Sequence, residues 1–242
     1  MIITSLDNKK IKELGKLKQK KYRDLTSTYL VEGEHLIQEA EKANVLEEVL
    51  IIDGYDINTS KSKTYVTREV MSKLTDLDTP CSMIGVCKKS NNNKIIGNKI
   101  LLLDDIQDPG NLGTIIRSSV AFNVDTIILS KNTVDLYNSK VIRSTQGMLF
   151  HINIISMDLE NAIEEIHKNN IQVYATDVVD GIDVRTLTDK SKYALVMGNE
   201  GNGVSNSIKE LCDKNLYIKM NDKAESLNVG VATSILLYEL GD

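Results

Sequence analysis

Short apolar runs alternate with amphipathic stretches along the second half of the chain. Runs of four or five apolar residues bounded by polar ones are typical of strands buried on both faces. These strands are expected at residues 100–103, 126–129, 152–155, 172–175, 193–197 and 216–219. Most are followed by stretches with apolar residues at helical spacing. The alternation predicts an α/β fold whose mostly parallel sheet carries helices on both faces.

Helical and strand-like segments also alternate before residue 90, although less regularly. The pattern predicts a basic helix ending near Tyr22, further helices at 34–43 and 68–74, and strands at 49–52 and 83–87. The polar segment "KKSNNNKIIGNK" that follows is typical of a linker. We therefore predict a small α/β domain over residues 1–90, a linker over 91–99, and a second domain over 100–242.

Composition indicates where the protein works and which ligands it lacks. The 242 residues include 41 % hydrophobic ones, enough for a substantial core. No apolar run approaches the roughly 20 residues that span a membrane, and the N-terminus does not resemble a secretory signal. The three cysteines and three histidines are scattered without metal-ligand spacing. We expect a cytoplasmic protein that binds no membrane and no metal.

Charge is unevenly distributed along this acidic chain. The formal net charge is −5, but residues 9–23 include eight basic residues and only one acidic residue, Glu13. These are Lys9, Lys10, Lys12, Lys16, Lys18, Lys20, Lys21 and Arg23. A solvated helix face explains the stretch as well as a contact with nucleic-acid phosphates does. The second interpretation gains weight only if the rest of the chain indicates a nucleic-acid substrate.

The loop after residues 100–103 holds unusual polar groups. It reads "DDIQDPGNLGTIIRSS", and ligands of parallel sheets bind beyond the carboxyl ends of the strands. We expect Asn111 to cap a helix that begins at Leu112. Arg117 lies off the buried stripe of that helix, and its side chain should lean back toward the loop. A capped turn with a surface arginine explains the segment alone equally well, and no dinucleotide-binding fingerprint is present.

Two further loops follow predicted strands. "GNEGNG", residues 198–203, lets a backbone approach a ligand closely and holds one carboxylate, Glu200. After the last strand, Ser226 is expected to cap a terminal helix that is apolar around much of its circumference. Gly230 within this helix indicates close packing, because glycine costs about 1 kcal/mol there. Such a helix must be buried by its own domain or in a dimer.

The three loops together carry a resemblance to a known family. "DPGNLGTIIRS", "MGNEGNGVS" and "AESLNVGVATSILLYE" resemble, in order, the three motifs of the SpoU branch of the SPOUT methyltransferases, the TrmH family of RNA ribose methyltransferases. The segment "KKIKELGKLKQKKYRDLTSTYLVEGEHLIQEA" is similar to the N-terminal substrate-binding domain of many members, a small α/β unit related to a ribosomal-protein fold. The resemblance implies transfer of a methyl group from S-adenosylmethionine to a ribose 2′-hydroxyl of RNA. Of the RNA targets, 23S rRNA is favoured over tRNA.

The resemblance also implies a deep trefoil knot in the second domain, a homodimer, and roles for particular residues. Gly198, Ile218 and Leu227 match positions that contact the cofactor. The polar residues of the reaction site match Asn111, Arg117, Glu200, Ser226 and Asn228. Contacts with RNA phosphates are expected from Lys9, Lys10, Lys20, Lys21 and Arg23. Many relatives have proline and glycine where this chain has Lys219 and Asp222, which puts the geometry of the cofactor loop in question.

Alternatives of other kinds stay open at this point. A knotted protein could bind RNA without catalysis, or the methyl group could go to a base instead of the ribose. Within the favoured reaction, Arg117 could stabilise the developing alkoxide or act as the base. An arginine is effectively always protonated, which favours stabilisation.

Overall fold

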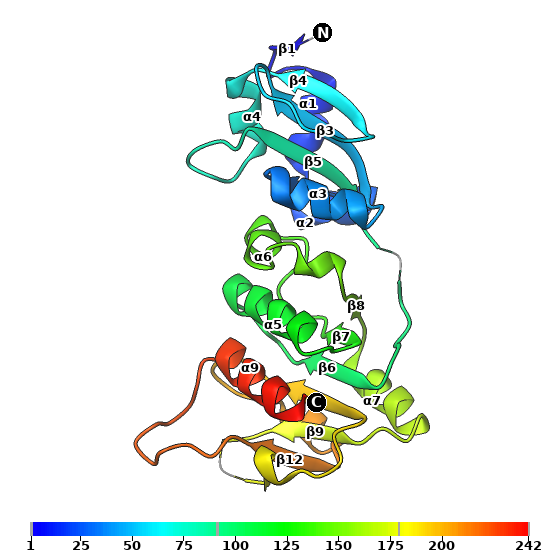
Figure 1. The fold of residues 1–242 in the computed structure, drawn as a ribbon, viewed down its shortest axis with the longest axis vertical. Helices are drawn as coiled ribbons and strands as arrows, with labels where there is room; N and C mark the ends of the chain where they lie inside the picture. The colour runs from blue at the N-terminus through cyan, green and yellow to red at the C-terminus, as the bar shows by residue number, and fades with distance from the viewer. Residues whose placement is uncertain (1, 91, 179, 242) are drawn as a thin grey trace. The chain divides into compact units, whose positions relative to one another are not determined.

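The computed structural model describes residues 2–90, 92–178 and 180–241. Residues 1, 91, 179 and 242, which fall within the predicted domains and linker, lie outside the described residues. The chain divides into two compact units (Figure 1). The first comprises Met1–Asn91 and Asp135–Phe150, and the second comprises Asn92–Val134 and His151–Asp242. The chain first passes from one unit to the other after residue 91, and residues 135–150 return to the first unit.

The first unit is built on a mixed five-stranded sheet in the order β1-β4-β3-β5-β2. The strands are β1 (Ile2–Ile3), β2 (Thr28–Glu32), β3 (Leu46–Ile52), β4 (Ser62–Val66) and β5 (Met83–Lys88). Strands β1, β4 and β3 are parallel, whereas β5 runs antiparallel to both β3 and β2. The described helices of residues 1–90 are α1 (Lys9–Lys16), α2 (Lys20–Thr26), α3 (Glu34–Lys42) and α4 (Arg68–Leu74).

The predicted single basic helix is wrong, because the chain breaks between α1 and α2. The backbone carbonyls of Leu17 and Lys18 at this break accept hydrogen bonds of 2.7 and 2.9 Å from the guanidinium of Arg23. Arg23 is only 5 % exposed and also pairs with Asp135. The break is therefore stabilised by a buried side chain.

The segment 135–150 docks onto the first unit through several kinds of contact. Besides the Arg23–Asp135 pair, the rings of Tyr29 and Tyr137 lie 4.5 Å apart between centroids. Arg143, in α6 (Ser139–Ser144), approaches Glu32 of β2 at 3.6 Å. The short 3-10 helix Met148–Phe150 ends the segment. These contacts make the segment an integral part of the first unit, although it is far from residues 1–91 in sequence.

The second unit contains a seven-stranded sheet in the order β10-β12-β9-β11-β6-β7-β8. All of its strand pairs are parallel. The strands are β6 (Lys99–Leu103), β7 (Thr126–Leu129), β8 (Asn153–Ser156), β9 (Val173–Thr176), β10 (Ile182–Asp183), β11 (Tyr193–Met197) and β12 (Lys214–Tyr217). The predicted α/β class and parallel sheet are confirmed, and β7 and β11 match the predicted bounds.

Helices cover both faces of this sheet (Figure 1). They are α5 (Pro109–Ala121), α7 (Leu159–Lys168), α8 (Asn206–Lys209) and α9 (Val229–Leu240), with a 3-10 turn at Val184–Thr186. One face packs in a core that α7 closes with Leu159, Ala162, Ile163 and Ile166. Helices α5 and α9 lie against each other, and a Cβ at Gly230 would meet Thr114 at 3.2 Å. The close packing expected at Gly230 is confirmed.

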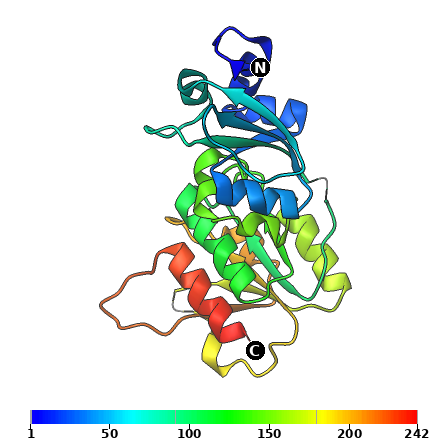
Figure 2. The same ribbon diagram turned by 45° about the horizontal axis from the view of Figure 1, so that its top comes forward.

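The connection between β12 and α9 projects from the second unit in both views (Figures 1 and 2). Lys219 and Asp222, the two departures from the family pattern, are exposed in this connection. Among the described residues, no helix is both long and apolar enough to cross a membrane. The trefoil knot implied by the resemblance stays a prediction.

Candidate active site

The register of two neighbouring strands sets the position of the candidate site. Leu103 at the end of β6 pairs with Met197 at the end of β11. Because the strands are parallel, the loops that follow them leave the same edge of the sheet side by side. The first loop leads into α5, and the second is the glycine-rich segment 198–203. Residues 94 positions apart in sequence therefore come into contact at this edge.

Helix α5 begins three residues earlier than the sequence indicated. Its first residue is Pro109, and the side chain of Asp108 caps it by accepting from the backbone N–H of Asn111 at 2.9 Å. The prediction that Asn111 caps the helix is wrong. Proline suits the first helical position because no intrahelical partner exists there for an N–H, and aspartate before it is a strong cap. The side chain of Asn111 is thereby left to make other contacts.

Glu200 is the point on which the first two loops converge. Its carboxylate accepts from the backbone N–H of Gln107 at 3.2 Å, that of Asp108 at 3.1 Å, and the side-chain Nδ2 of Asn111 at 3.0 Å. Burial raises the pKa of Glu200, but the hydrogen bonds from Asn111 and from backbone N–H groups outweigh it and hold the pKa below its ordinary value. The carboxylate is thus kept ionised as a fixed acceptor.

The third motif joins this network at the start of α9. Asn228 caps α9, accepting from the N–H groups of Gly230 at 2.9 Å and Val231 at 3.2 Å, while its Nδ2 donates to Asn111 Oδ1 at 2.9 Å. The prediction that Ser226 caps this helix is wrong. Because the helix starts at Val229, Ser226 lies too far ahead of its first N–H groups to bond them.

Glu200, Asn111 and Asn228 form one directional chain of hydrogen bonds. An ionised carboxylate only accepts, so Asn111 must present its Nδ2 to Glu200. Its Oδ1 then faces Asn228, which in turn must present its own Nδ2 and leave Oδ1 to the helix. The orientation of both amides is therefore determined by the charge on Glu200. We call this chain the amide relay.

The glycine loop that carries Glu200 is folded tightly on itself. Asn199 and Gly203 exchange backbone hydrogen bonds of 3.0 and 2.9 Å, and Asn199 Oδ1 accepts from the N–H of Gly201 at 2.9 Å. The Nδ2 of Asn199 donates to the carbonyl of Asp105 at 2.9 Å, which ties this loop to the first one. A Cβ at Gly198 would lie 2.0 Å from the backbone of Gly203, so only glycine fits there.

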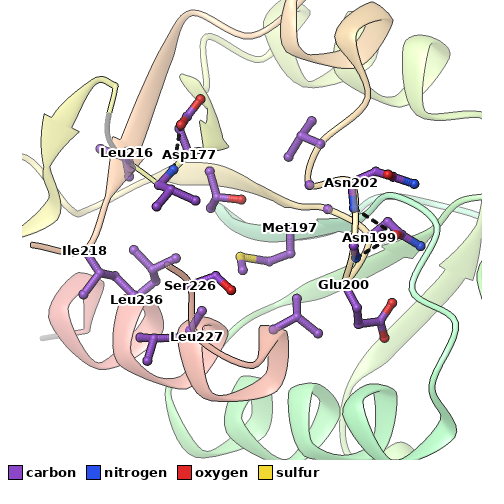
Figure 3. A pocket seen from close by; sticks show the side chains of 18 of the residues that line it. Asp177, Met197, Asn199, Glu200, Asn202, Leu216, Ile218, Ser226, Leu227 and Leu236 are labelled. Atoms are coloured by element: carbon purple, nitrogen blue, oxygen red, sulfur yellow. Dashed lines mark hydrogen bonds between the residues drawn. The ribbon is translucent and has the colours of Figure 1, made fainter. Parts of the chain in front are cut away.

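A cavity of about 420 Å³ opens beside this loop (Figure 3). Its volume lies within the range that small-molecule ligands occupy. Apolar side chains form one wall, including Met197, Ile218, Leu227 and Leu236. The lining also includes the polar residues Asp177, Asn199, Glu200, Asn202, Lys209 and Ser226. Glu200 is the residue that belongs both to the cavity wall and to the amide relay.

The structure brings most of the predicted site residues together. Gly198, Ile218, Leu227, Glu200 and Ser226 line the cavity, and the amide relay connects Asn111 and Asn228 to Glu200.

Arg117 is placed differently from these residues. It is exposed on α5, and within the described part of the chain no hydrogen bond or ion pair involves its guanidinium. Its neighbours Thr114 and Ser118 both face α9, the latter through a 2.7 Å hydrogen bond between Ser118 Oγ and Ser234 Oγ.

The basic residues of the first unit separate into two groups. Lys9, Lys20 and Lys21 are exposed and form no ion pair among the described residues. Lys10, by contrast, pairs with Glu48 and donates to Thr64 at 3.1 Å. Arg23 is buried with its donors occupied. The exposed lysines thus belong to a solvated surface, whereas Lys10 and Arg23 stabilise the fold.

Several residues that shape the site were missed by the sequence reasoning. Asp108 carries the helix-start signal of an acidic residue directly before proline, which could have identified it as the cap. Asn199 organises the glycine loop, and Asp177 with Lys209 lines the cavity, but no local pattern distinguishes them from ordinary loop residues. Among the described residues, no group of three or more His, Cys, Asp or Glu side chains could hold a metal ion.

Comparisons with known proteins agree with this geometry. Residues 98–238 match the model of the SpoU rRNA Methylase family, and residues 8–85 match the MRM3-like substrate binding domain. The chain is 37 % identical to the 23S rRNA (guanosine(2553)-2'-O)-methyltransferase RlmP of Bacillus subtilis (strain 168), over 98 % of each chain. It is 33 % identical over 142 residues to a putative TrmH family tRNA/rRNA methyltransferase of Staphylococcus aureus (strain COL), covering 58 % of this chain and 57 % of that protein.

A solved structure described as an AdoMet-bound rRNA methyltransferase from Sinorhizobium meliloti superposes with a TM-score of 0.87. The two chains are 29 % identical, and the match covers 99 % of this chain and 97 % of the other. The predicted family is confirmed by a family match over more than half of the chain and by a relative that aligns along nearly all of it. This chain belongs to the SpoU rRNA Methylase family.

Proposed function

We propose that the protein transfers a methyl group from S-adenosylmethionine to a ribose 2′-hydroxyl of 23S rRNA. The observation that carries the proposal is the amide relay, which joins residues of all three motifs at the wall of a ligand-sized cavity. The relative from Bacillus subtilis is named for 2′-O-methylation of 23S rRNA, and the Sinorhizobium meliloti structure for bound AdoMet. Both names support the substrate and the cofactor proposed here.

The cavity fits the proposed cofactor on chemical grounds. A flat adenine ring needs an apolar wall, which Ile218, Leu227 and Leu236 provide. The absence of a Cβ at Gly198 lets the loop backbone close tightly beside that wall. When bound there, S-adenosylmethionine supplies a methyl group on a positively charged sulfur, and the 2′-oxygen of the RNA is its acceptor.

The chain's own residues hold the reacting groups in place. Glu200, fixed by three hydrogen bonds, sets the position of the glycine loop beside the cavity. The amide relay orients Asn111 and Asn228 at the starts of α5 and α9. Orientation of this kind supports catalysis because a misplaced acceptor reacts slowly.

Arg117 is proposed to stabilise the alkoxide that develops on the 2′-oxygen. It lies on the helix that Asp108 caps, it is exposed, and it is positively charged at every working pH. Its exposed guanidinium is available to an RNA ribose or the adjacent phosphate. The 2′-hydroxyl proton leaves to solvent or to a group of the RNA complex.

RNA is proposed to contact the first unit through Lys9, Lys20 and Lys21, which are exposed and form no ion pair among the described residues. Salt-dependent attraction of RNA phosphates needs accessible cations of this kind. The residues of the earlier expectation that pair internally, Lys10 and Arg23, are assigned structural roles instead. The protein is proposed to act in the cytoplasm, together with its RNA.

A homodimer is part of the same proposal. Helix α9 exposes two large apolar side chains, Val231 at 47 % and Tyr238 at 69 %, and Leu227 just before the helix is 37 % exposed. Burying such a row of side chains against a second copy removes apolar surface from water. Sedimentation analysis should give the mass of two chains.

The test is incorporation of a labelled methyl group into RNA. Purified protein, labelled S-adenosylmethionine and either 23S rRNA or tRNA should give label in 23S rRNA only, at a nucleotide whose own linkage resists alkaline cleavage. The Arg117→Ala variant should retain RNA binding and lose methyl transfer by about a hundredfold or more, whereas Arg185→Ala, which alters another exposed arginine of the second unit, should not.

Other outcomes separate the alternatives. Tight RNA binding without any transfer would establish the noncatalytic interpretation. Label at a nucleotide that alkali still cleaves would indicate methylation of a base, and label in tRNA alone would overturn the choice of substrate.

A further inference from the structure

Two carboxylates are among the residues that line the cavity, and only one of them belongs to the amide relay. Glu200 lies at the end near the starts of α5 and α9. Asp177, directly after β9, lies on the other side of Met197 and near Leu216 (Figure 3). No motif of the sequence singled out Asp177. A charged group that lines a ligand cavity at a strand's carboxyl end calls for a functional account.

The carboxylate of Asp177 is held in one orientation. One oxygen accepts from the backbone N–H of Val178 at 2.6 Å, and the other pairs with the ammonium of Lys209 in α8. The side chains of Asp177 and Lys209 are 19 % and 32 % exposed, and both line the cavity. The hydrogen bond and the ion pair together restrict rotation of the side chain. A carboxylate offers about four acceptor positions on its two oxygens.

We propose that Asp177, positioned by Lys209, binds the ribose hydroxyls of the adenosyl group in this cavity and thereby selects a ribonucleoside cofactor. The proposal rests on the proposed function, because that function supplies the adenosyl ligand. It goes further by assigning a recognition role to a side chain outside the three motifs. Lys209 is a positioning residue in this account, since it acts through Asp177.

The lining of the cavity favours the ribose over other polar groups of the ligand. An adenine ring held against Ile218 and Leu227, with the reacting end near Glu200, would leave the sugar within the same cavity, whose lining includes Asp177. Its vicinal hydroxyls offer two parallel donors, which match the two oxygens of one carboxylate. Carboxylates at strand ends of parallel sheets bind ribose hydroxyls in other nucleotide sites by the same chemistry.

Calorimetric binding of S-adenosylhomocysteine and of its 2′-deoxy and 3′-deoxy analogues to the full chain tests the proposal without catalysis. The unaltered protein should bind at least one deoxy analogue about tenfold more weakly than the parent, as expected for loss of a hydrogen bond to a charged group. The affinity of Asp177→Asn for S-adenosylhomocysteine should fall by a similar factor. The ratio between its affinities for S-adenosylhomocysteine and for that deoxy analogue should fall to about twofold.

Two further variants separate recognition from folding. Lys209→Met should lower the affinity for S-adenosylhomocysteine less than Asp177→Asn does. It should also keep part of the preference over the deoxy analogue, because Asp177 remains. Asp183→Asn, which alters a carboxylate paired with Arg185 in the same unit but outside the cavity lining, should change nothing. Thermal unfolding of each variant shows whether it is folded.

Several results would overturn the proposal. If the unaltered protein binds both deoxy analogues as tightly as S-adenosylhomocysteine, the proposal fails before any variant is made. Equal weakening of parent and analogues in Asp177→Asn would reduce Asp177 to a structural role. If the unaltered protein binds no S-adenosylhomocysteine at all, the proposed function itself fails, an outcome distinct from loss of ribose discrimination.

Discussion

The Nδ2 of Asn111 donates a 3.0 Å hydrogen bond to the carboxylate of Glu200, 89 positions further along the chain. This contact fixes which way the Asn111 amide faces, because an ionised carboxylate cannot donate. The first and second motifs are therefore joined by one polar bond whose direction depends on the charge of Glu200.

Replacing Glu200 by glutamine should lower methyl transfer at least tenfold. Glutamine has a single acceptor oxygen and adds two donors, so it cannot satisfy Gln107 N–H, Asp108 N–H and Asn111 together. Transfer rates of the variant, measured at saturating cofactor and RNA, check this expectation.

The stability that the unaltered protein has over this variant should depend on pH. The pKa of Glu200 in the folded protein lies below its ordinary value of 4.5, so its carboxylate stabilises the folded state above that pH. This contribution is lost as the pH falls through the lowered pKa. The difference in unfolding free energy between the unaltered protein and Glu200→Gln should therefore shrink in acid. Denaturant titrations from pH 7 to pH 3 would contradict this if the difference grew.

Asn228 performs two tasks that substitutions can separate. Asn228→Asp keeps an oxygen that caps α9 but loses the Nδ2 donor to Asn111, so stability should change little while transfer falls. Asn228→Ala loses both and should also lower the unfolding free energy by about 1 kcal/mol. If Asn228→Asp transfers methyl groups at the full rate, the amide relay has no role in the reaction.

Gly198 and Gly201 form a matched pair within one loop. A Cβ at Gly198 would meet the backbone of Gly203 at 2.0 Å, whereas one at Gly201 would have only Asn199 Oδ1 at 3.6 Å nearby. Gly198→Ala should therefore weaken S-adenosylhomocysteine binding more than tenfold, because the loop must open. Gly201→Ala should bind nearly as the unaltered protein does. Equal affinities in a calorimetric comparison would show that the loop tolerates opening.

The basic residues of the first unit should respond in two ways. Arg23→Met leaves the carboxylate of Asp135, which is only 15 % exposed, without its partner and should lower the unfolding free energy by about 3 kcal/mol. The double variant Lys20→Gln with Lys21→Gln should keep stability within about 0.5 kcal/mol. Its RNA affinity should fall, with a salt dependence reduced by about one ion for each lost phosphate contact. An unchanged salt dependence would remove these lysines from the RNA contact.

The sequence predicted most elements of the second unit because their signals are local. Tyr193–Met197 is a short apolar run of the kind typical of a buried strand. The last strand, at Lys214–Tyr217, lies two residues before its predicted position because pairing with β9 sets its register and includes polar residues. Strand β4 was missed because "SKTYV" is not an apolar run, and its pairing with β3 makes it a strand. Pairing partners distant in sequence decided both cases.

For the site, the three loops could be found from the sequence, but the contacts within them could not. The helix caps fell on Asp108 and Asn228, so the side chain assigned to capping in the first motif, that of Asn111, joined the amide relay instead. The break between α1 and α2 depends on Arg23, whose partner Asp135 is 112 positions away. Such contacts depend on tertiary structure, and no local pattern encodes them.

The grouping of Asp135–Phe150 with the first unit limits how the chain can be divided. A cut near residue 91 would strip Tyr137 of its aromatic neighbour Tyr29 and leave the carboxylate of Asp135 without its guanidinium. The shortened chain would then expose apolar surface that the first unit covers, and it would tend to aggregate. Recombination that grafts the first unit onto another methyltransferase must therefore transplant two separate pieces of gene together.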